Sequence, residues 1–544
     1  MLDFGTGLGV GKGVASGESP DPPAPASLDV YILAGQSNAH GHAPVDDLTS
    51  SQQQPKSGWF YTSWHHNTSN ASTTQYYSSW AETVVPGYTR GDATESTLAG
   101  SDYFGPELGF ISQINGNGNI PAILKYATGA TSLFDGATTS SWDTTSSPVG
   151  DCWTGFKSAI SDGLSKLTSA GRSYTVKGLI WYQGESDGAN STPTGTISTK
   201  LTEFFNATLS YLSGTHSVNT TNFPIIITKP ADANGNVLSW DREYDEASFN
   251  FNARIVNAYD HHGAYTNVHL QGQDMWNLGV NQGKLMNDII SPSTSAYTPA
   301  DSSTALWIDA NDNTTITKSG SNLTQIDDKS GQGKDVTPVS GSTIVPTANK
   351  IRRKQTLVFS GDADAMRTPD FGWYDPRLFT TPNGVHDWFL VVKPSFNNNQ
   401  DAVFSTQKGP SITLIPLSGR KYQLYYAGIA IGSELATSDQ DGILNMIGIR
   451  WDTDNNQVST WLNGNLTNDA VTTTVSGGIQ MNNTTMVVNY MTQYGYAIKT
   501  DGSFCESIIT DATNDRQKIE GYLAHKWGLE SKLPHSHPYR YTPA

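Results

Sequence analysis

The stretch Asp29-Val-Tyr-Ile-Leu-Ala-Gly-Gln-Ser-Asn38 decides the fold of the first half of the chain. Its apolar run, Val30–Ala34, is typical of a strand buried on both faces, and the polar residues after it predict a turn where the strand ends. The turn presents Ser37 at the edge of a sheet. A serine in that place is either a nucleophile, which needs a base and donors for an oxyanion, or the N-cap of a helix.

Further apolar runs repeat this pattern through the first half of the chain. They are Pro121–Tyr126, Val176–Tyr182 and Phe223–Thr228. Between them, apolar residues at helical spacing predict amphipathic helices around Phe156–Leu167 and Ile197–Leu212. Alternating strands and helices indicate an open α/β sheet whose site lies at the carboxyl ends of its strands.

The Ser/Thr/Gln-rich segment 50–101 breaks the rhythm of strands and helices. Among many small polar residues, its aromatic side chains include Trp59, Trp64, Tyr76, Tyr77 and Trp80. Long segments of this kind often form binding surfaces. We therefore expect it to be an insertion that shapes a binding cleft.

Composition shifts divide the chain. Residues 1–27 are rich in Gly and then in Pro, which indicates an arm and linker, and a Ser/Thr/Pro stretch makes 291–303 a second linker. The α/β pattern fills residues 28–290. Residues 304–544 contain short alternating segments between Gly, Asn and Asp turns, which predict an all-β sandwich, and one closing helix is expected around Ile519–Trp527.

The overall composition excludes several classes of function. A net charge of −17 argues against nucleic acid, whose phosphates are bound by clustered Lys and Arg. No stretch reaches the ~20 apolar residues of a membrane span, and no secretory signal opens the chain. Cys152 and Cys505 are too far apart to define a disulfide framework or zinc ligands, and His40 and His42 have no third ligand at a suitable spacing. We expect no metal and no cofactor.

Two other strand ends carry groups that suit an oxyanion. Gly129 follows the second apolar run and offers a backbone N–H, while Gln183 follows the third and carries a side-chain amide. Together with the Ser37 N–H they predict an oxyanion hole of three donors. Considered alone, Gln183 can equally be a turn residue whose amide is fully hydrogen-bonded. Glu185 can equally be an ordinary carboxylate on the surface.

Four segments resemble one enzyme family. They are Gly35–Asn38, Phe104–Phe110, Lys125–Leu133 and Trp181–Ser186, which resemble the motifs of the sialate O-acetylesterase and acetylxylan esterase branch of the SGNH hydrolases. The resemblance implies a flavodoxin-like α/β/α sandwich and the removal of acetyl groups from sugars. It also implies Ser37 as nucleophile and Gly129 and Gln183 in the oxyanion hole. We expect Asn38, Glu185 and Thr266 to be supporting residues of this site.

The segment Thr266–Gly279 resembles the last block of the same family and selects His269 as the base over His261 and His262. The family places Asp three residues before this histidine, where it fixes the imidazole tautomer. Here that place is taken by Thr266. The site is then a Ser-His dyad, or it uses another support: Asp260, Asp274, Glu185 or a backbone carbonyl. The substitution is also compatible with a non-catalytic domain.

The second half resembles another family at both of its ends. The segments Leu306–Asp312 and Asp327–Gly333 resemble the opening of a concanavalin A/laminin-G-like jelly roll, and Arg516–Gly528 and Leu533–Tyr539 resemble its end. Such domains bind glycans in some proteins and only pack or oligomerise in others.

These features predict a serine esterase that removes O-acetyl groups from a cell-surface polysaccharide. The arm, the missing signal peptide and the esterase-plus-lectin organisation resemble phage tail spikes, so we expect a virion tail protein that works outside a cell. Its partners would be an acetylated polysaccharide and other tail proteins, and the analogy favours a homotrimer. A bacterial origin stays open. The alternative is a non-catalytic glycan-binding adhesin or a structural tail protein.

Overall fold

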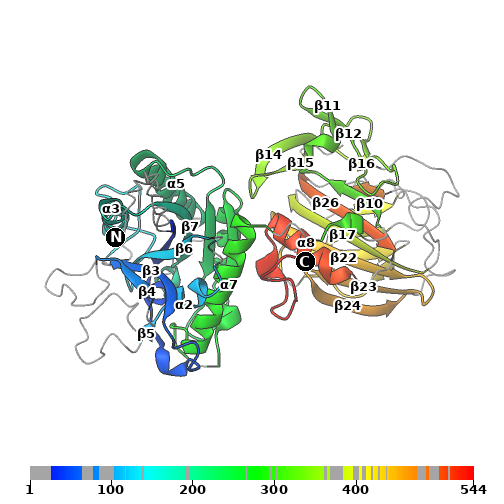
Figure 1. Ribbon diagram of the computed structural model, residues 1–544. Helices are drawn as coiled ribbons and strands as arrows, with labels where there is room; N and C mark the ends of the chain where they lie inside the picture. Colours follow the sequence, from blue (N-terminus) through cyan, green and yellow to red (C-terminus); the bar gives the residue numbers. More distant parts are fainter. Residues whose placement is uncertain are drawn as a thin grey trace, which may run out of the picture.

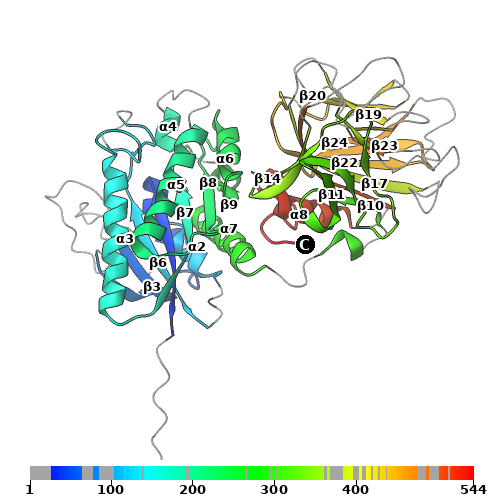
Figure 2. The ribbon, with the colours of Figure 1, turned by 90° about the horizontal axis from the view of Figure 1, so that it is seen from above.

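A computed structural model of the chain shows two domains, the first built from a sheet and helices and the second almost entirely from strands (Figures 1 and 2). It describes residues 26–63, 78–84, 103–114, 116, 118–135, 140–189, 197–264, 266–292, 297–301, 304–359, 364–367, 384–395, 404–406, 412–417, 421–426, 429–436, 438–473, 486–488, 501–511 and 515–544. Of the proposed arm, residues 1–27, only 26 and 27 lie inside these ranges.

The first domain is organised around a seven-stranded sheet. Its strands are β1 (Leu28–Gly35), β3 (Lys56–Ser63), β4 (Ala81–Val84), β6 (Ile120–Ala127), β7 (Tyr174–Tyr182), β8 (Pro224–Lys229) and β9 (Asn252–Asn257). The order across the sheet is β4-β3-β6-β1-β7-β8-β9. All neighbours pair in parallel except β4, which runs antiparallel at the edge. The carboxyl ends of the parallel strands therefore share one edge.

Strand β1 lies in the middle of this sheet. It pairs with β6 on one side and with β7 on the other, and all eight of its residues are buried. This position explains its continuous apolar run, because both of its faces are covered by helices. The turn that follows β1 is consequently held at the centre of the carboxyl edge.

Helices cover both faces of the sheet (Figure 2). One face packs against α3 (Asp151–Ser169), α5 (Ile197–His216) and α6 (Asp241–Ser248), and the other against α2 (Glu107–Ile111) and α7 (Gly272–Ile290). Short elements complete the domain: α1 (Ser37–His40), α4 (Glu185–Ala189), β2 (Ala43–Pro44), β5 (Tyr103–Phe104), and the 3-10 turns Val45–Asp47 and Ala258–His261. Among the described helices, none is long and apolar enough to cross a membrane.

The predicted α/β organisation is confirmed, with the four expected strands and both expected helices in place. The expectation for segment 50–101 is partly wrong, since residues 56–63 form β3 inside the sheet. Its apolar core, Trp59–Tyr61, is only three residues long and is hidden among Ser, Thr and Gln. Trp64, Tyr76 and Tyr77 lie outside the described residues. The finer expectation of a flavodoxin-like SGNH fold stays a prediction.

The second domain is an antiparallel β-sandwich. Its strands are β10 (Thr304–Asp309), β11 (Ile316–Ser319), β12 (Asn322–Ile326), β13 (Thr337–Pro338), β14 (Val345–Ile351), β15 (Lys354–Phe359), β16 (Met366–Arg367), β17 (Val385–Ser395), β18 (Phe404–Thr406), β19 (Ile412–Leu417), β20 (Lys421–Tyr426), β21 (Ile429–Ile431), β22 (Asn445–Asp452), β23 (Gln457–Leu462), β24 (Asn465–Thr472), β25 (Met486–Val488) and β26 (Asp501–Asp511). The larger sheet runs β14-β15-β26-β17-β22-β23-β24, with β10 also paired to β26, and the second runs β13-β16-β25-β18-β19-β20-β21.

Alternate residues of the larger sheet face two different cores. Trp388 and Leu390 of β17 pack toward the second sheet, whereas Phe389 and Val391 pack beneath the closing helix α8 (Arg516–Trp527). This two-residue alternation is what the sequence pattern predicts for a sheet covered on both sides. The antiparallel sandwich is thereby confirmed, and its finer assignment as a jelly roll stays a prediction.

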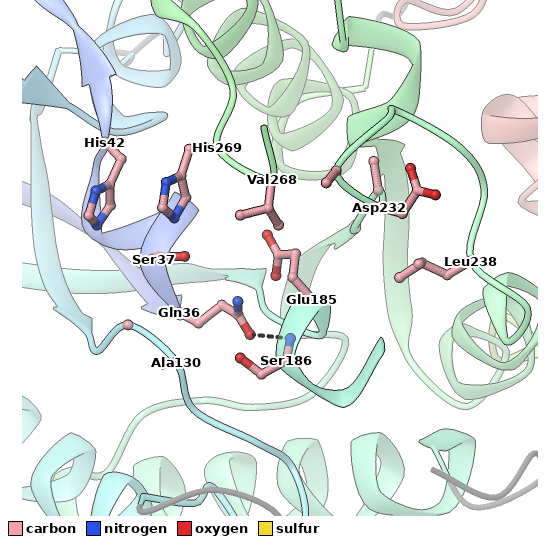
Figure 3. Close-up of a pocket in the computed structure, with 13 residues that line it drawn as sticks. Gln36, Ser37, His42, Ala130, Glu185, Ser186, Asp232, Leu238, Val268 and His269 are labelled. Atoms are coloured by element: carbon pink, nitrogen blue, oxygen red, sulfur yellow. Dashed lines mark hydrogen bonds between the residues drawn. The ribbon is translucent and has the colours of Figure 1, made fainter. Parts of the chain in front are cut away.

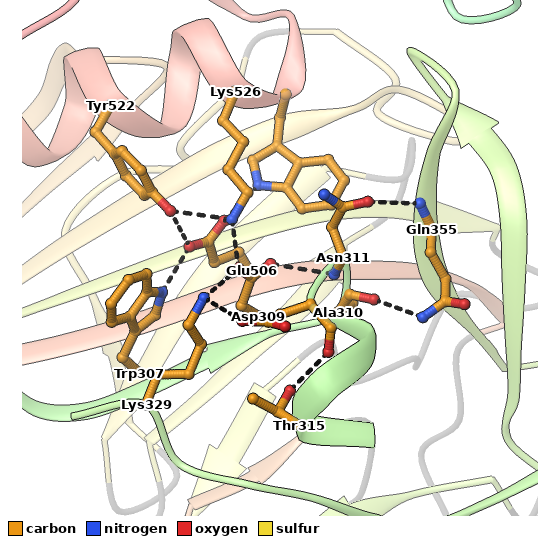
Figure 4. Close-up of polar contacts among 12 residues, drawn as sticks. Trp307, Asp309, Ala310, Asn311, Thr315, Lys329, Gln355, Glu506, Tyr522 and Lys526 are labelled. Atoms are coloured by element: carbon orange, nitrogen blue, oxygen red, sulfur yellow. Dashed lines mark hydrogen bonds and ion pairs between the residues drawn. The ribbon is translucent and has the colours of Figure 1, made fainter. Parts of the chain in front are cut away.

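A buried glutamate joins the two ends of the second domain (Figure 4). Glu506 on β26 accepts hydrogen bonds from the indole of Trp307 at 2.7 Å and from the hydroxyl of Tyr522 at 2.9 Å. Its other oxygen takes the indole of Trp527 at 2.7 Å and the ammonium of Lys526 at 2.7 Å. The segments Leu306–Asp312 and Arg516–Gly528, which resemble the two ends of a concanavalin A/laminin-G-like domain, therefore both contact the carboxylate of Glu506.

The C-terminal segment of the second domain packs on the first domain. Arg540 pairs with Asp260 at the end of the 3-10 turn after β9, and His525 hydrogen-bonds Asp288 of α7 at 3.0 Å. The amide of Asn257 donates to the carbonyl of Ser531 at 2.8 Å. Charged and polar contacts thus join the domains on the side away from α3 and α5 (Figure 1).

Candidate active site

The turn after β1 is fixed by the two neighbouring strands. The Gln36 N–H donates to the Tyr182 carbonyl at 3.0 Å, and the Thr128 N–H donates to the Gly35 carbonyl at 3.0 Å. Gly35 adopts a φ of 149°, and a Cβ there would lie 1.9 Å from the Tyr182 oxygen. Only glycine fits this close approach of two strands. Ser37 follows as the first residue of α1, and it is 7% exposed.

A cavity of about 590 Å³ opens at this turn, along the carboxyl edge of the sheet (Figure 3). Its walls come from the ends of β1, β6, β7 and β8 and from the loop before α7. The lining residues are Gln36, Ser37, His42, Gly129, Ala130, Glu185, Ser186, Ala231, Asp232, Ala233, Leu238, Val268 and His269. Ser37 and His269 therefore share one cavity with Gly129, as the sequence predicts for strand ends that meet at one edge.

Gly129 lies directly against the nucleophile turn. A Cβ on Gly129 would lie 3.6 Å from the Cβ of Ser37, so the two backbones approach closely. Backbone N–H groups in such a turn are donors of the kind that stabilise an oxyanion. Gly129 therefore lies beside Ser37, and its role in an oxyanion hole stays a prediction.

Asn38 ties the histidine loop to the nucleophile turn. Its amide nitrogen donates to the Val268 carbonyl at 2.9 Å, and its amide oxygen accepts from the Leu270 N–H at 3.1 Å. These bonds hold the backbone on both sides of His269. The same nitrogen donates to Glu185 at 2.5 Å. One buried side chain thus connects Ser37, His269 and Glu185.

The imidazole of His269 lies flat against a second imidazole, that of His42 (Figure 3). The ring centroids are 4.2 Å apart and the ring planes differ by 11°. His40 approaches the other ring, that of His42, edge-on at 5.9 Å. No group of three or more His, Cys, Asp or Glu among the described residues is arranged to hold a metal ion.

Comparison with known families agrees with this geometry. Residues 27–288 match the family model described as carbohydrate esterase, sialic acid-specific acetylesterase. This part of the chain is therefore similar to carbohydrate esterase domains. The match covers Ser37, Gly129 and His269 together, and it supports a carbohydrate acetylesterase.

Solved structures give weaker similarities. A protein from Arabidopsis thaliana is 17% identical with a TM-score of 0.34, over 48% of this chain and 98% of that one. Trypanosoma rangeli sialidase in complex with sialic acid is 13% identical with a TM-score of 0.29, over 38% of this chain and 31% of the sialidase. Domain 4 of a GH43 arabinanase from Geobacillus stearothermophilus, in complex with arabinotriose, is 17% identical with a TM-score of 0.29, over 38% and 92%. Comparison with curated proteins finds no match.

The esterase domain does not bring Gln183 into the cavity. Its amide nitrogen donates to the Thr131 carbonyl at 3.1 Å and to Asp187 at 2.6 Å, so both of its hydrogens are engaged. The side chain is fully buried. The prediction that Gln183 completes the oxyanion hole is therefore corrected: its amide supports the loop after β6 instead.

Gln36 reaches the cavity that Gln183 does not. Its amide oxygen accepts from the N–H groups of Ser186 at 3.3 Å and Gly184 at 3.4 Å, at the start of α4. This leaves its amide nitrogen turned toward the cavity beside Ser37 (Figure 3). Gln36 was not among the predicted site residues, although its place directly before Ser37 was a usable signal.

Glu185 is a buried acid inside the esterase pocket. Burial raises its pKa to about 7, and the hydrogen bond from Asn38 opposes this rise only in part. Its Oε2 atom is buried and has no hydrogen-bond partner within the described part of the chain. The structure thus places one of the predicted supporting residues in contact with the site.

The other candidate acids lie elsewhere. Thr266, in the place of the usual Asp, is exposed on the loop. Asp260 is paired with Arg540 of the second domain, and Asp274 lies in the first turn of α7. Of the acids considered from the sequence, only Glu185 lines the cavity.

Proposed function

We propose that the chain is a serine esterase that removes O-acetyl groups from a carbohydrate, with Ser37 as nucleophile and His269 as base. The observation that carries the proposal is that Ser37, Gly129 and His269 line one cavity within a carbohydrate esterase domain. They come from three separate parts of the chain.

The proposed reaction uses these groups in sequence. Ser37 Oγ attacks the carbonyl carbon of the acetyl group while His269 takes the hydroxyl proton. The Ser37 and Gly129 N–H groups and the Gln36 amide stabilise the oxyanion. His269 then protonates the departing sugar hydroxyl, and an attacking water gives acetate and free Ser37. Small apolar side chains on the cavity wall, Ala130, Ala231 and Ala233, suit a short acyl group.

We further propose that the substrate is an acetylated surface polysaccharide and that the chain acts outside a cell as a phage tail protein, as a homotrimer. This rests on the sequence features alone: the Gly- and Pro-rich arm and the resemblance to an esterase-plus-lectin organisation. Release of acetate from a panel of O-acetylated capsular polysaccharides tests the substrate. Sedimentation of the full chain tests the trimer, and a monomer would contradict it.

Ser37→Ala tests the catalytic proposal. Loss of a serine nucleophile removes covalent catalysis, so hydrolysis of p-nitrophenyl acetate and release of acetate from glycans should fall at least about a thousandfold. Ser158→Ala makes the same change on the exposed face of α3 and should leave both rates unaltered. If wild type and Ser37→Ala are equally inert on every substrate, while both still bind polysaccharide, the chain is a non-catalytic adhesin.

A further inference from the structure

The stack of His42 on His269 is a feature that the proposed reaction does not yet use. The two rings reach each other from distant parts of the chain, His42 from the turn after α1 and His269 from the loop before α7. Both line the cavity. The rings are nearly parallel, with 11° between their planes and 4.2 Å between their centroids.

The backbone holds His42 rigidly. Gly41 has a φ of 111°, and a Cβ there would lie 2.7 Å from the Gly105 nitrogen. On the other side, Ala43 pairs with Phe104 in the β2–β5 ladder. His42 thus lies between a turn that requires glycine and a paired strand, which fix the backbone from which its ring extends.

The backbone of His269 is also held. Asn38 binds the flanking Val268 and Leu270, and Asn267 accepts from the His269 N–H at 3.0 Å. These contacts fix the backbone, whereas the plane of an imidazole is set by its χ2 torsion, which has broad intrinsic preferences. A parallel ring at 4.2 Å restricts that torsion because rotation would drive the edge of one ring into the face of the other.

We propose that His42 is the positioning residue of the catalytic base: its ring face sets the plane of His269 toward Ser37, at a site where Thr266 has no carboxylate for that task. The proposal rests on the proposed esterase function. Stacking acts through the ring face and needs no hydrogen bond from His42.

The experiment compares His42→Leu, which keeps an apolar side chain but loses the aromatic face, with His42→Phe, which keeps that face. His42→Leu should lower kcat about tenfold, which corresponds to about 1.4 kcal/mol of transition-state stabilisation, while KM changes much less. His42→Phe should recover most of the lost kcat. The rate of inactivation by an organophosphorus fluoridate, which also requires activated Ser37, should follow the same order. His216→Leu, at the carboxyl end of α5 and outside the cavity lining, serves as the control and should leave kcat unaltered.

Each outcome decides the proposal. A wild-type kcat in His42→Leu overturns it, and so does a His42→Phe variant as slow as His42→Leu, because His42 would then act through its nitrogens. If thermal melting shows that His42→Leu is unfolded, the decision passes to His42→Phe and His42→Gln, which should differ in kcat. A separate measurement tests the esterase function itself: if wild type and Ser37→Ala have equal activity, that function is wrong, whatever the His42 variants do.

Discussion

The two domains each bury a glutamate, and the two side chains differ in every contact. Glu506 in the sandwich has both oxygens occupied, by two indoles, a phenol and an ammonium group. Glu185 in the esterase domain has one oxygen bound to Asn38 and the other without a hydrogen-bond partner among the described residues. Burial raises the pKa of both carboxyls, and Lys526 lowers that of Glu506.

These contacts indicate that Glu506 has a structural role, whereas Glu185 is available for chemistry. A buried carboxylate that is fully hydrogen-bonded fixes its neighbours in one arrangement, and it leaves no acceptor for a ligand. A carboxyl that lines a cavity with an unused oxygen can exchange a proton near neutral pH or accept a bond from a substrate. The contrast therefore predicts where substitutions affect folding and where they affect chemistry.

The largest effect is expected from Glu506→Ala. It leaves two buried indoles without an acceptor and removes one partner of Lys526, so the sandwich should lose about 3–5 kcal/mol of unfolding free energy. Chemical denaturation followed by tryptophan fluorescence measures this loss, and hydrolysis of p-nitrophenyl acetate should not change. Glu506→Gln should be intermediate, since an amide nitrogen cannot accept a bond. If a folded Glu506→Ala protein lost esterase activity, Glu506 would not have a purely structural role, and the prediction would be wrong.

A smaller effect is expected from Glu185→Gln, and it depends on pH. The folded pKa of about 7 lies above the ordinary value of 4.5, so the folded state binds this proton more tightly than the unfolded state. The carboxyl therefore costs stability increasingly as pH rises from about 4.5 to 7, and the full cost remains above 7. Glu185→Gln removes a cost of up to about 3 kcal/mol, and it should be more stable than wild type at pH 8 but not at pH 4.5. A stability difference that is the same at both pH values would contradict this.

The smallest effect in this series is expected from Asn38→Ala, and it falls on activity. Losing the bonds to Val268, Leu270 and Glu185 frees the histidine loop, so kcat should fall about ten- to thirtyfold, or about 1.4–2 kcal/mol. Asn38→Asp keeps the acceptor for Leu270 but brings a carboxylate beside Glu185, and it should be no better. Steady-state kinetics with a simple acetyl ester decide this, and unchanged kcat in both variants would show that the loop is held by other contacts.

Much of the fold followed from local sequence. The apolar runs predicted β1, β6, β7 and β8, and the helical spacing predicted α3, α5 and α8, because burial on one or both faces leaves a direct periodic signal. Strand β3 was missed because its three aromatic residues lie in a polar segment, and β9 because its apolar residues alternate with Asn252 and Arg254. Those strands depend on pairing with partners distant in sequence, which periodicity does not reveal.

By itself, the sequence determined the turn that carries Ser37: a buried strand followed directly by a polar turn with Ser37 in it. It also selected Gly129 and His269. Only the tertiary structure decided which amide faces the cavity, Gln36 rather than Gln183, and that Asn38 binds the loop of His269 while His42 stacks on its ring. The physical reason is that a strand and its turn are set by neighbouring residues, whereas the partners of a side chain at a sheet edge are set by segments that meet only after folding.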